Sequence, residues 1–327
     1  MAYVRIEKSE ERRAEDKKTP PCKKGSMQRR RRSEASFVYG VIALPLLQFI
    51  IFYVAVNVNS VALAFKTYDR LSGEYIFSGF NNFKDFFYDV SNESILAICF
   101  KNSVTQYLFG LLIIMPLGIV SSFFVYRKIP LAGFFKVILF LPSIISSIVI
   151  VLMYRYFIEW VIPPFLMKLG MENTPNFFYD SAYAFKTLLF FGFWSGFGGG
   201  IILYTGAMSR IPDSLVEYGQ LEGMKMSQEF FRITIPMIWP TITVFLVTGV
   251  AGLFTGSVSA YAFYAENASY NVYTLGYYLF VKVIGSNASL ADYPYASAAG
   301  ICFTLIAAPI TVFVKYLLEK YGPNPEY

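Results

Sequence analysis

The chain has 327 residues, of which 55% are hydrophobic and only 15% are charged, and its formal net charge is +6. This composition is typical of a polytopic membrane protein and leaves no room for a soluble domain. The sequence contains no histidine, which excludes histidine-based triads, HExxH zinc sites and histidine proton relays. It also lacks a GxxxxGK[ST] motif, so the chain itself is not expected to bind ATP in a P-loop.

The first 36 residues form a basic tail. They hold 12 of the 28 Lys and Arg residues and end near the run Arg29-Arg30-Arg31-Arg32. With few apolar side chains, this tail is expected to be disordered. By the positive-inside rule it is an orientation signal that keeps the N-terminus in the cytoplasm. A specific lipid-binding or nucleic-acid-binding role is the alternative, and the charge distribution argues against nucleic acid as a partner.

Beyond the tail, the sequence contains long runs without Asp, Glu, Lys or Arg, each long enough to cross the hydrocarbon core of a bilayer. These six runs are 35–65, 102–126, 137–154, 187–209, 233–265 and 293–314. The first run exceeds the length of a signal-peptide core, so it is expected to stay as a membrane anchor. We therefore predict an all-α membrane protein with six transmembrane helices.

The distribution of Lys and Arg sets the orientation. Twenty of these residues fall on the side of the tail when the spans alternate, and five fall clearly on the other side. The twenty are the 12 of the tail with Arg127, Lys128, Lys136, Arg210, Lys225, Arg232, Lys315 and Lys320, and the five are Lys66, Arg70, Lys84, Lys168 and Lys282. This bias predicts that both termini lie in the cytoplasm.

The outside segments are short and polar. Glu266–Asp292 is rich in tyrosine, and its Tyr277, Tyr278 and Phe280 are expected at the membrane interface, where amphipathic rings settle. The three cysteines are scattered, without the spacing of a metal site or a disulfide. No metal ligands and no catalytic residues are therefore assigned.

A polar stretch at 210–235 separates the fourth and fifth runs. Within it Leu215, Tyr218, Leu221 and Met224 recur at helical spacing and predict one apolar stripe. Gly223 then allows a sharp turn. An apolar stripe on a cytoplasmic loop needs a cover, which points to another protein. The alternative is an amphipathic helix that packs on its own protein or lies among lipid headgroups.

This loop resembles the EAA loop of ATP-binding-cassette importer permeases. Glu217 stands for the acidic residue of the motif, Glu222 for the acid before the glycine, Gly223 for the glycine and Pro236 for the closing proline. The chain departs from the motif at Tyr218-Gly219, where the family usually has two alanines. The resemblance implies that the loop docks on a separate ATPase. The residues it assigns to ATPase coupling are Glu217, Tyr218, Gly219, Leu221, Glu222, Gly223, Met224 and Pro236.

Shorter motifs resemble the carbohydrate branch of that family. They are Phe77-x-Gly79-Phe80-x-Asn82-Phe83, Asn102, and Phe140-Leu141-Pro142. The resemblance implies a maltose-type, type I importer built from this permease, a second related permease, a pair of ATPase subunits and an extracytoplasmic solute-binding lipoprotein. ATP and Mg would be used by the ATPase partner, and no cofactor would be bound by this chain.

Glycines mark the fourth and fifth spans. Gly192, Gly196 and Gly200 lie on one face of a helix because they repeat every four residues. The pattern has two interpretations, which are close helix packing and a translocation path left wide by missing side chains. Residues assigned to that path are Gly192, Trp194, Ser195, Gly196, Gly199, Thr248, Gly252 and Thr255.

Together these patterns predict a cytoplasmic tail at 1–36, a six-span permease domain at 37–320 and a C-terminal tail at 321–327 in a bacterial plasma membrane. The predicted function is uptake of a sugar or oligosaccharide driven by a separate ATPase. The alternative is a stand-alone secondary transporter or channel for a small polar solute, which would work without an ATPase. A membrane-embedded enzyme is disfavoured because the spans contain no clustered catalytic set.

Overall fold

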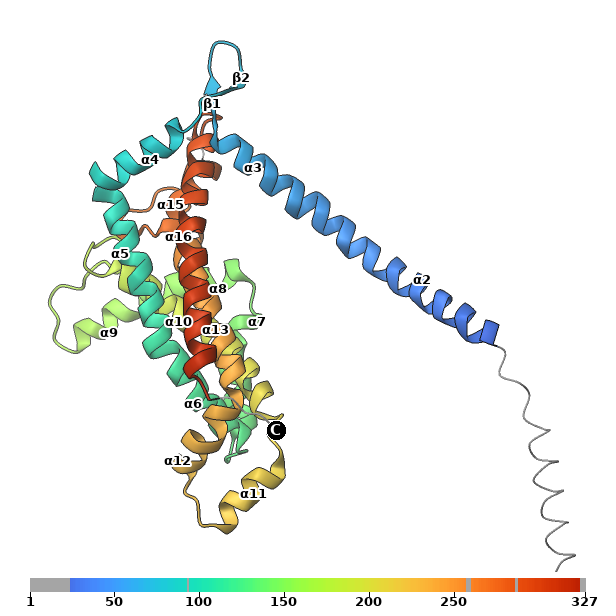
Figure 1. The fold of residues 1–327 in the computed structure, drawn as a ribbon. Coiled ribbons are helices and arrows are strands. Elements are labelled where there is room, and N and C mark those ends of the chain that lie inside the picture. The colour runs from blue at the N-terminus through green and yellow to red at the C-terminus, as the bar shows by residue number, and fades with distance from the viewer. Residues whose placement is uncertain (1–23, 93, 257–259, 286–287, 324–327) are drawn as a thin grey trace, which may run out of the picture. The chain divides into compact units, whose positions relative to one another are not determined.

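The computed structural model describes residues 24–92, 94–256, 260–285 and 288–323. The chain divides into two compact units, Met1–Ser60 and Val61–Tyr327. Helices dominate (Figure 1), and six helical stretches among the described residues are long and apolar enough to cross a membrane. The prediction of an all-α protein with six spans is therefore confirmed, and the N-in/C-in orientation stays a prediction.

The described part of the first unit is one helical stretch. It consists of α2 (Lys24–Gln48), the π-helical segment η1 (Phe49–Ala55) and α3 (Val56–Ala64), which ends just inside the second unit. Its apolar part, Phe37–Ala64, matches the predicted run at 35–65. The helix begins at Lys24, so the expectation of disorder is wrong for 24–36, because extending an existing helix needs no new nucleation step. Residues 1–23 of the predicted tail lie outside the described residues.

The second unit opens with a β-hairpin where only a polar loop was expected. Strand β1 (Lys66–Asp69) pairs antiparallel with β2 (Glu74–Phe77). The Asp69 carboxylate closes the turn by accepting the N–H groups of Leu71 and Ser72, and these bonds lower the pKa of Asp69. The short helix α4 (Asn81–Asn92) follows.

Two asparagines from the short motifs that resemble the carbohydrate branch hydrogen-bond to backbone carbonyls of other segments. Asn82 donates both protons of its amide Nδ2 to the carbonyls of Ala64 and Lys66, at 2.8 and 2.7 Å. Asn102 does the same with the carbonyls of Asn271 and Tyr273, at 2.8 and 2.9 Å. Each amide therefore joins its helix to two carbonyls of a segment elsewhere in the chain.

The second and fourth predicted spans are confirmed, with shifted ends. The second is a continuous stretch that begins at Ser94 and includes Lys101, so it starts before the predicted residue 102. Its parts are α5 (Ser94–Phe109), the π-helical η2 (Gly110–Ile114) and α6 (Met115–Tyr126). The fourth span is α10 (Ala184–Met208), against a predicted 187–209.

The third span is broken, so the prediction of one helix at 137–154 is wrong. Its parts are α7 (Ala132–Ile144), α8 (Ser147–Tyr156), the π-helical η3 (Phe157–Val161) and α9 (Ile162–Lys168). Ile145 and Ser146 have extended ψ angles of 141° and 136°. The last turn of α7 is weak because Pro142 has no N–H and the Ser143 hydroxyl binds the Phe140 carbonyl. The helix of membrane length is Ser147–Lys168.

The fifth predicted span, 233–265, lies, except for its last residue, within the stretch of membrane length Met226–Tyr264, in which the long helix α13 ends at Thr255. The segments of this region are α11 (Asp213–Leu221), α12 (Met226–Glu229), the π-helical η4 (Phe230–Thr234), α13 (Ile235–Thr255), α14 (Ala260–Tyr264), the 3₁₀ turn η5 (Tyr270–Val272) and α15 (Leu275–Ile284). Helix α13 ends at Thr255, where α15 approaches so closely that a Cβ on Gly276 would lie 2.6 Å from the Thr255 carbonyl carbon.

Helix α15 also overturns the assignment of the tyrosines to a membrane interface. Tyr277 is 0% exposed and Tyr278 is 5% exposed, and both belong to the hydrophobic core. The hydroxyl of Tyr277 donates to the Ala265 carbonyl, which satisfies the polar tip inside the protein. The last helix, α16 (Asp292–Tyr321), extends the predicted run at 293–314 in the C-terminal direction.

The described part of the second unit has two hydrophobic clusters. One gathers side chains of α4, α5, α8, α15 and α16, with Leu188, Tyr277 and Phe303 among its members. The other lies beside α11 and includes Tyr204, Met208 and Ile238. Helix α10 contributes to both clusters, so it runs through the middle of the unit (Figure 1).

One glycine of α10 lies directly on the backbone of α7. A Cβ on Gly198 would lie 2.6 Å from the Cα of Phe140 and closer still to the carbonyl oxygen of Leu139. Gly199, its neighbour, has nothing within 4 Å of the same position. The contact of α10 with α7 therefore tolerates no side chain at 198.

We predict that Gly198→Ala lowers the midpoint of thermal unfolding and the amount of protein in the membrane, because overpacking costs about 1–3 kcal/mol or more. Gly199→Ala is the matched control and should leave both quantities unchanged. Equal behaviour of the two variants would contradict the backbone contact between α10 and α7.

Candidate functional site

The loop between α10 and α13 is a helical hairpin at the end of the unit opposite β1 and β2 (Figure 1). Helix α11 ends at Leu221, the chain turns, and α12 begins at Met226. The turn depends on Gly223, whose φ of 72° is in the left-handed region that L side chains rarely adopt. The sharp turn predicted at Gly223 is therefore confirmed.

The predicted single apolar stripe is wrong, because its members lie on two faces. Leu215 and Met224 pack against the cluster beside α11. Tyr218 and Leu221 are 69% and 84% exposed, although both are large and apolar. Val216, a residue outside the predicted stripe, supplies the buried contact of α11 instead. The four predicted positions span too much of the helix circumference to share one surface.

Gly219 is the point where the two arms of the hairpin meet. A Cβ there would lie 3.3 Å from Cδ1 of Ile233 and 3.4 Å from Sδ of Met224. Even the Cβ of the alanine usual at this position of the motif would require these two flexible side chains to shift slightly, so glycine fits here without a shift. The neighbouring position 218 points outward, so it accepts a tyrosine.

The remaining residues of the EAA-like motif lie on the hairpin and at the start of α13. Glu217 and Glu222 are exposed on the hairpin. Pro236 is the second residue of α13, directly after the π-helical η4, and it has no N–H to donate within this continuous helix. The hairpin thus presents two large apolar side chains beside two carboxylates.

An ion pair fixes the hairpin to the end of α6. Glu229, the last residue of α12, is only 4% exposed, and its Oε1 lies 3.4 Å from Nη1 of Arg127. That oxygen has no hydrogen-bond partner, so Arg127 is its charge partner without a well-aligned hydrogen bond. A buried carboxylate needs such a partner, because desolvation disfavours its charged form.

We predict that Arg127→Ala destabilises the protein. Removing one partner of a buried pair costs about 3–5 kcal/mol, and we expect about 1–3 kcal/mol because solvent reaches Arg127. Thermal unfolding of the purified chain measures the loss. The combined variant Arg127→Met with Glu229→Leu removes both charges at similar volume and should recover most of it. A combined variant as unstable as Arg127→Ala would show that the ion pair does not hold the hairpin.

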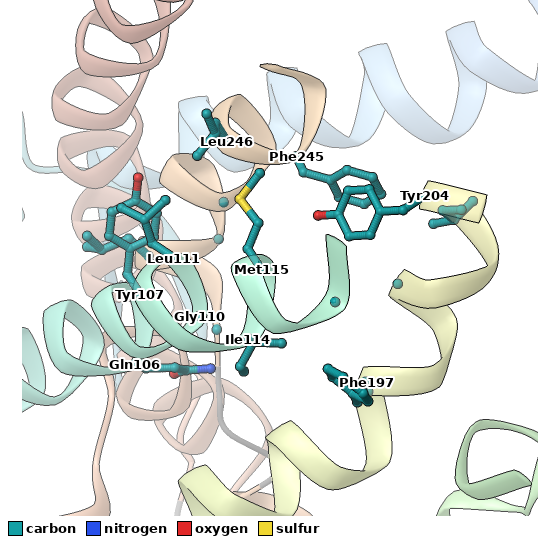
Figure 2. A pocket seen from close by; sticks show the side chains of 18 of the residues that line it. Gln106, Tyr107, Gly110, Leu111, Ile114, Met115, Phe197, Tyr204, Phe245 and Leu246 are labelled. Carbon is teal, nitrogen blue, oxygen red and sulfur yellow. The ribbon is translucent and has the colours of Figure 1, made fainter. Parts of the chain in front are cut away.

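A cavity of about 500 Å³ lies between α5, η2, α6, α10 and α13. Figure 2 shows Gln106 and Tyr107 from the second span on one side and Phe197, Tyr204 and Phe245 on the other. The wall is mainly apolar and rich in glycine. Its glycines are Gly110, Gly118, Gly196, Gly200, Gly249, Gly252 and Gly256.

Aromatic rings lie on some of these glycines. A Cβ on Gly249 would lie 3.3 Å from the ring of Tyr107, and one on Gly118 would lie 3.4 Å from the ring of Tyr204. Gly196 and Gly252 have nothing within 4 Å, so they leave open space. The same residue type thus has two uses, close ring contacts in some places and free volume in others.

The structure brings together only part of the predicted path. Gly196 and Gly252 line the cavity, and six predicted residues do not: Gly192, Trp194, Ser195, Gly199, Thr248 and Thr255. The hydroxyls of Ser195 and Thr248 bind carbonyls of their own helices, at 2.8 Å each. Sequence reasoning missed Ser103, Gln106 and Tyr107, although they are polar residues within the second span.

Comparisons with known proteins agree on one family. The sequence model described as "Binding-protein-dependent transport system inner membrane component" matches residues 93–322. The chain is 24% identical to the multiple sugar-binding transport system permease protein MsmF of Streptococcus mutans, over 86% of this chain and 94% of that protein. It is 21% identical to the arabinooligosaccharides transport system permease protein AraP of Bacillus subtilis, over 82% and 83%.

A solved structure has a similar fold. It is the crystal structure of a bacterial ABC transporter involved in the import of the acidic polysaccharide alginate, with a TM-score of 0.72 and 21% identity. The match covers 88% of this chain and 97% of that chain.

Proposed function

The chain belongs to the family of binding-protein-dependent transport system inner membrane components, and on that premise we propose that it is the permease subunit of an ATP-driven sugar importer. It is a multi-pass protein of the bacterial plasma membrane and a transport component rather than an enzyme. The proposed transport unit contains a second permease, a pair of ATPase subunits that use ATP and Mg, and an extracytoplasmic solute-binding lipoprotein.

The helical hairpin of α11 and α12 carries this proposal. Tyr218 and Leu221 are exposed on it, beside the carboxylates of Glu217 and Glu222. Exposed apolar groups of this size mark a surface that a partner covers. The excess of Lys and Arg on the same side supports a cytoplasmic position, and an ATPase there could dock on the hairpin.

A sugar or oligosaccharide is the proposed substrate. Relatives such as MsmF and AraP are named for sugar transport, and one similar structure is titled as an alginate transporter in complex with an alginate pentasaccharide-bound periplasmic protein. The cavity suits such a solute, because Tyr107 and Phe197 offer ring faces and Gln106 offers an amide. Sugars have apolar C–H faces and polar hydroxyls that match these groups.

We predict that Leu221→Ser and Tyr218→Ser together abolish co-purification of the ATPase and uptake, while the abundance of the permease stays normal. Both side chains are exposed, so their loss removes contact area without unfolding the chain. Leu71→Ser is the control, since Leu71 is 99% exposed at the hairpin tip at the other end of the unit. Undiminished uptake by the double variant at normal abundance would reject the hairpin as the ATPase contact.

We predict that Gly196→Leu reduces uptake of an oligosaccharide more than uptake of a monosaccharide. A Cβ at 196 would meet nothing within 4 Å, so a leucine there extends into the free volume of the cavity. Gly192→Leu is the matched control, because its Cβ also meets nothing within 4 Å but does not line the cavity. Assembly with the partner subunits is measured alongside. Equal uptake of both sugars by both variants would exclude this cavity from the path.

A further inference from the structure

A separate cavity of about 450 Å³ lies where the second, third and fourth spans end near the α11–α12 hairpin. It is walled by the turn after α6, the first turns of α7 and the last turns of α10. The large glycine-rich cavity shares none of its lining residues, so the two cavities are distinct.

Two lysines border this cavity, Lys128 from the turn and Lys136 from α7. Lys128 has a φ of 51°, a left-handed conformation that is costly for a residue with a side chain. The nearby Arg127 is paired with Glu229. Among the described residues, the charged ones that line the cavity are Lys128 and Lys136, so its rim is cationic.

The wall also holds a hydroxyl without a partner. Oγ1 of Thr205 is buried and makes no hydrogen bond. A threonine in a helix commonly donates to the carbonyl four residues earlier, but Thr205 makes no such bond to the Ile201 carbonyl. Buried hydroxyls are nearly always hydrogen-bonded, so Thr205 indicates a polar group that is still to be bound.

Most of the other lining residues are apolar, although Tyr126 and Ser209 also border the cavity. Val125, Ile129 and Leu131 line it beside the two lysines. A cationic rim, a free hydroxyl donor and an apolar wall at the end of membrane spans suit an amphiphile with a negatively charged head. Water alone would satisfy Thr205 but would use neither the lysines nor the apolar wall.

We propose that this cavity binds the phosphate group of an anionic phospholipid. Lys128 and Lys136 neutralise the phosphate, Thr205 donates a hydrogen bond to it, and Ile129 and Leu131 contact the glycerol and the start of the acyl chains. Free phosphate has the same charge and acceptors but nothing to fill the apolar wall, so a soluble phosphate compound would bind more weakly.

The test is a lipid titration of the full-length chain, purified in neutral detergent, followed by native mass spectrometry. Short-chain phosphatidylglycerol is compared with phosphatidylcholine and with inorganic phosphate. We expect retention of phosphatidylglycerol in preference to the other two. Lys128→Gln and Lys136→Gln should each weaken binding about fivefold, since a lysine near an anionic surface contributes about 1 kcal/mol and 1.4 kcal/mol is tenfold.

Two further variants separate a built site from general surface charge. Thr205→Val keeps the shape of the side chain and all charges, and it should weaken binding about tenfold by removing a hydrogen bond to a charged group. Lys320→Gln removes one cation at the end of α16 and should change binding less than about twofold. Thermal unfolding without lipid checks that each variant is folded.

Loss with Lys128→Gln, Lys136→Gln and Thr205→Val, but not with Lys320→Gln, supports the site. Equal losses with all the lysine variants and none with Thr205→Val would overturn it in favour of diffuse attraction. Binding of inorganic phosphate as tight as that of phosphatidylglycerol would assign the site to a soluble phosphate compound instead. If phosphatidylglycerol is not retained, water is the partner of the Thr205 hydroxyl and the proposal is overturned.

Discussion

The close packing of α10 against α6 and α7 is the contact on which the rest of the second unit depends. Lipid is as apolar as a leucine side chain, so helices in a membrane gain little from burying apolar groups and associate through close packing and hydrogen bonds. Gly198 brings α10 onto the backbone of α7. The Ser122 hydroxyl of α6 shares its proton between the Gly118 carbonyl of its own helix, at 2.7 Å, and the Ile201 carbonyl of α10, at 3.2 Å. With α10 fixed in this way, its other face can line a cavity and its end can carry the α11–α12 hairpin.

The two interpretations of the glycines are both right, at different residues. In an α-helix, residues two apart point in nearly opposite directions, because each residue turns the helix by about 100°. Gly198 therefore faces α7, while Gly196 and Gly200 face the large cavity. Gly192 shares the face of Gly196 but lies about 6 Å further along the axis, beyond the cavity. Spacing in sequence can assign a face, whereas the length of a cavity along that face depends on neighbouring helices.

Span number and the turn at Gly223 were predictable because they follow from local properties, which are hydrophobic length and the freedom of glycine. The break at Ile145–Ser146 was missed although its causes, Pro142 and the Ser143 hydroxyl, are local. The burial of α15 was not predictable, because it depends on distant contacts. Asn102 binds carbonyls of Asn271 and Tyr273 about 170 residues away in sequence, as its separations of 169 and 171 show. Those bonds and the Gly276 contact hold α15 inside the protein, so its tyrosines lose the interfacial position that their chemistry favours.

The hairpin and the large cavity share one helical element. From Met226 the chain runs through α12, η4 and α13 to Thr255 without leaving helical geometry. Its start is tied to α6 by Glu229, its middle lines the cavity, and its end abuts Gly276 of α15. If the hairpin moves, the part of α13 that lines the cavity therefore moves with it, unless the helix bends between them. It can yield most easily at η4, where the hydrogen bonds are π-helical, and at Pro240, which removes a backbone donor. Both points lie between the hairpin and the cavity. The stiffness of the helix from η4 to Pro240 therefore determines how far the cavity wall moves when the hairpin moves.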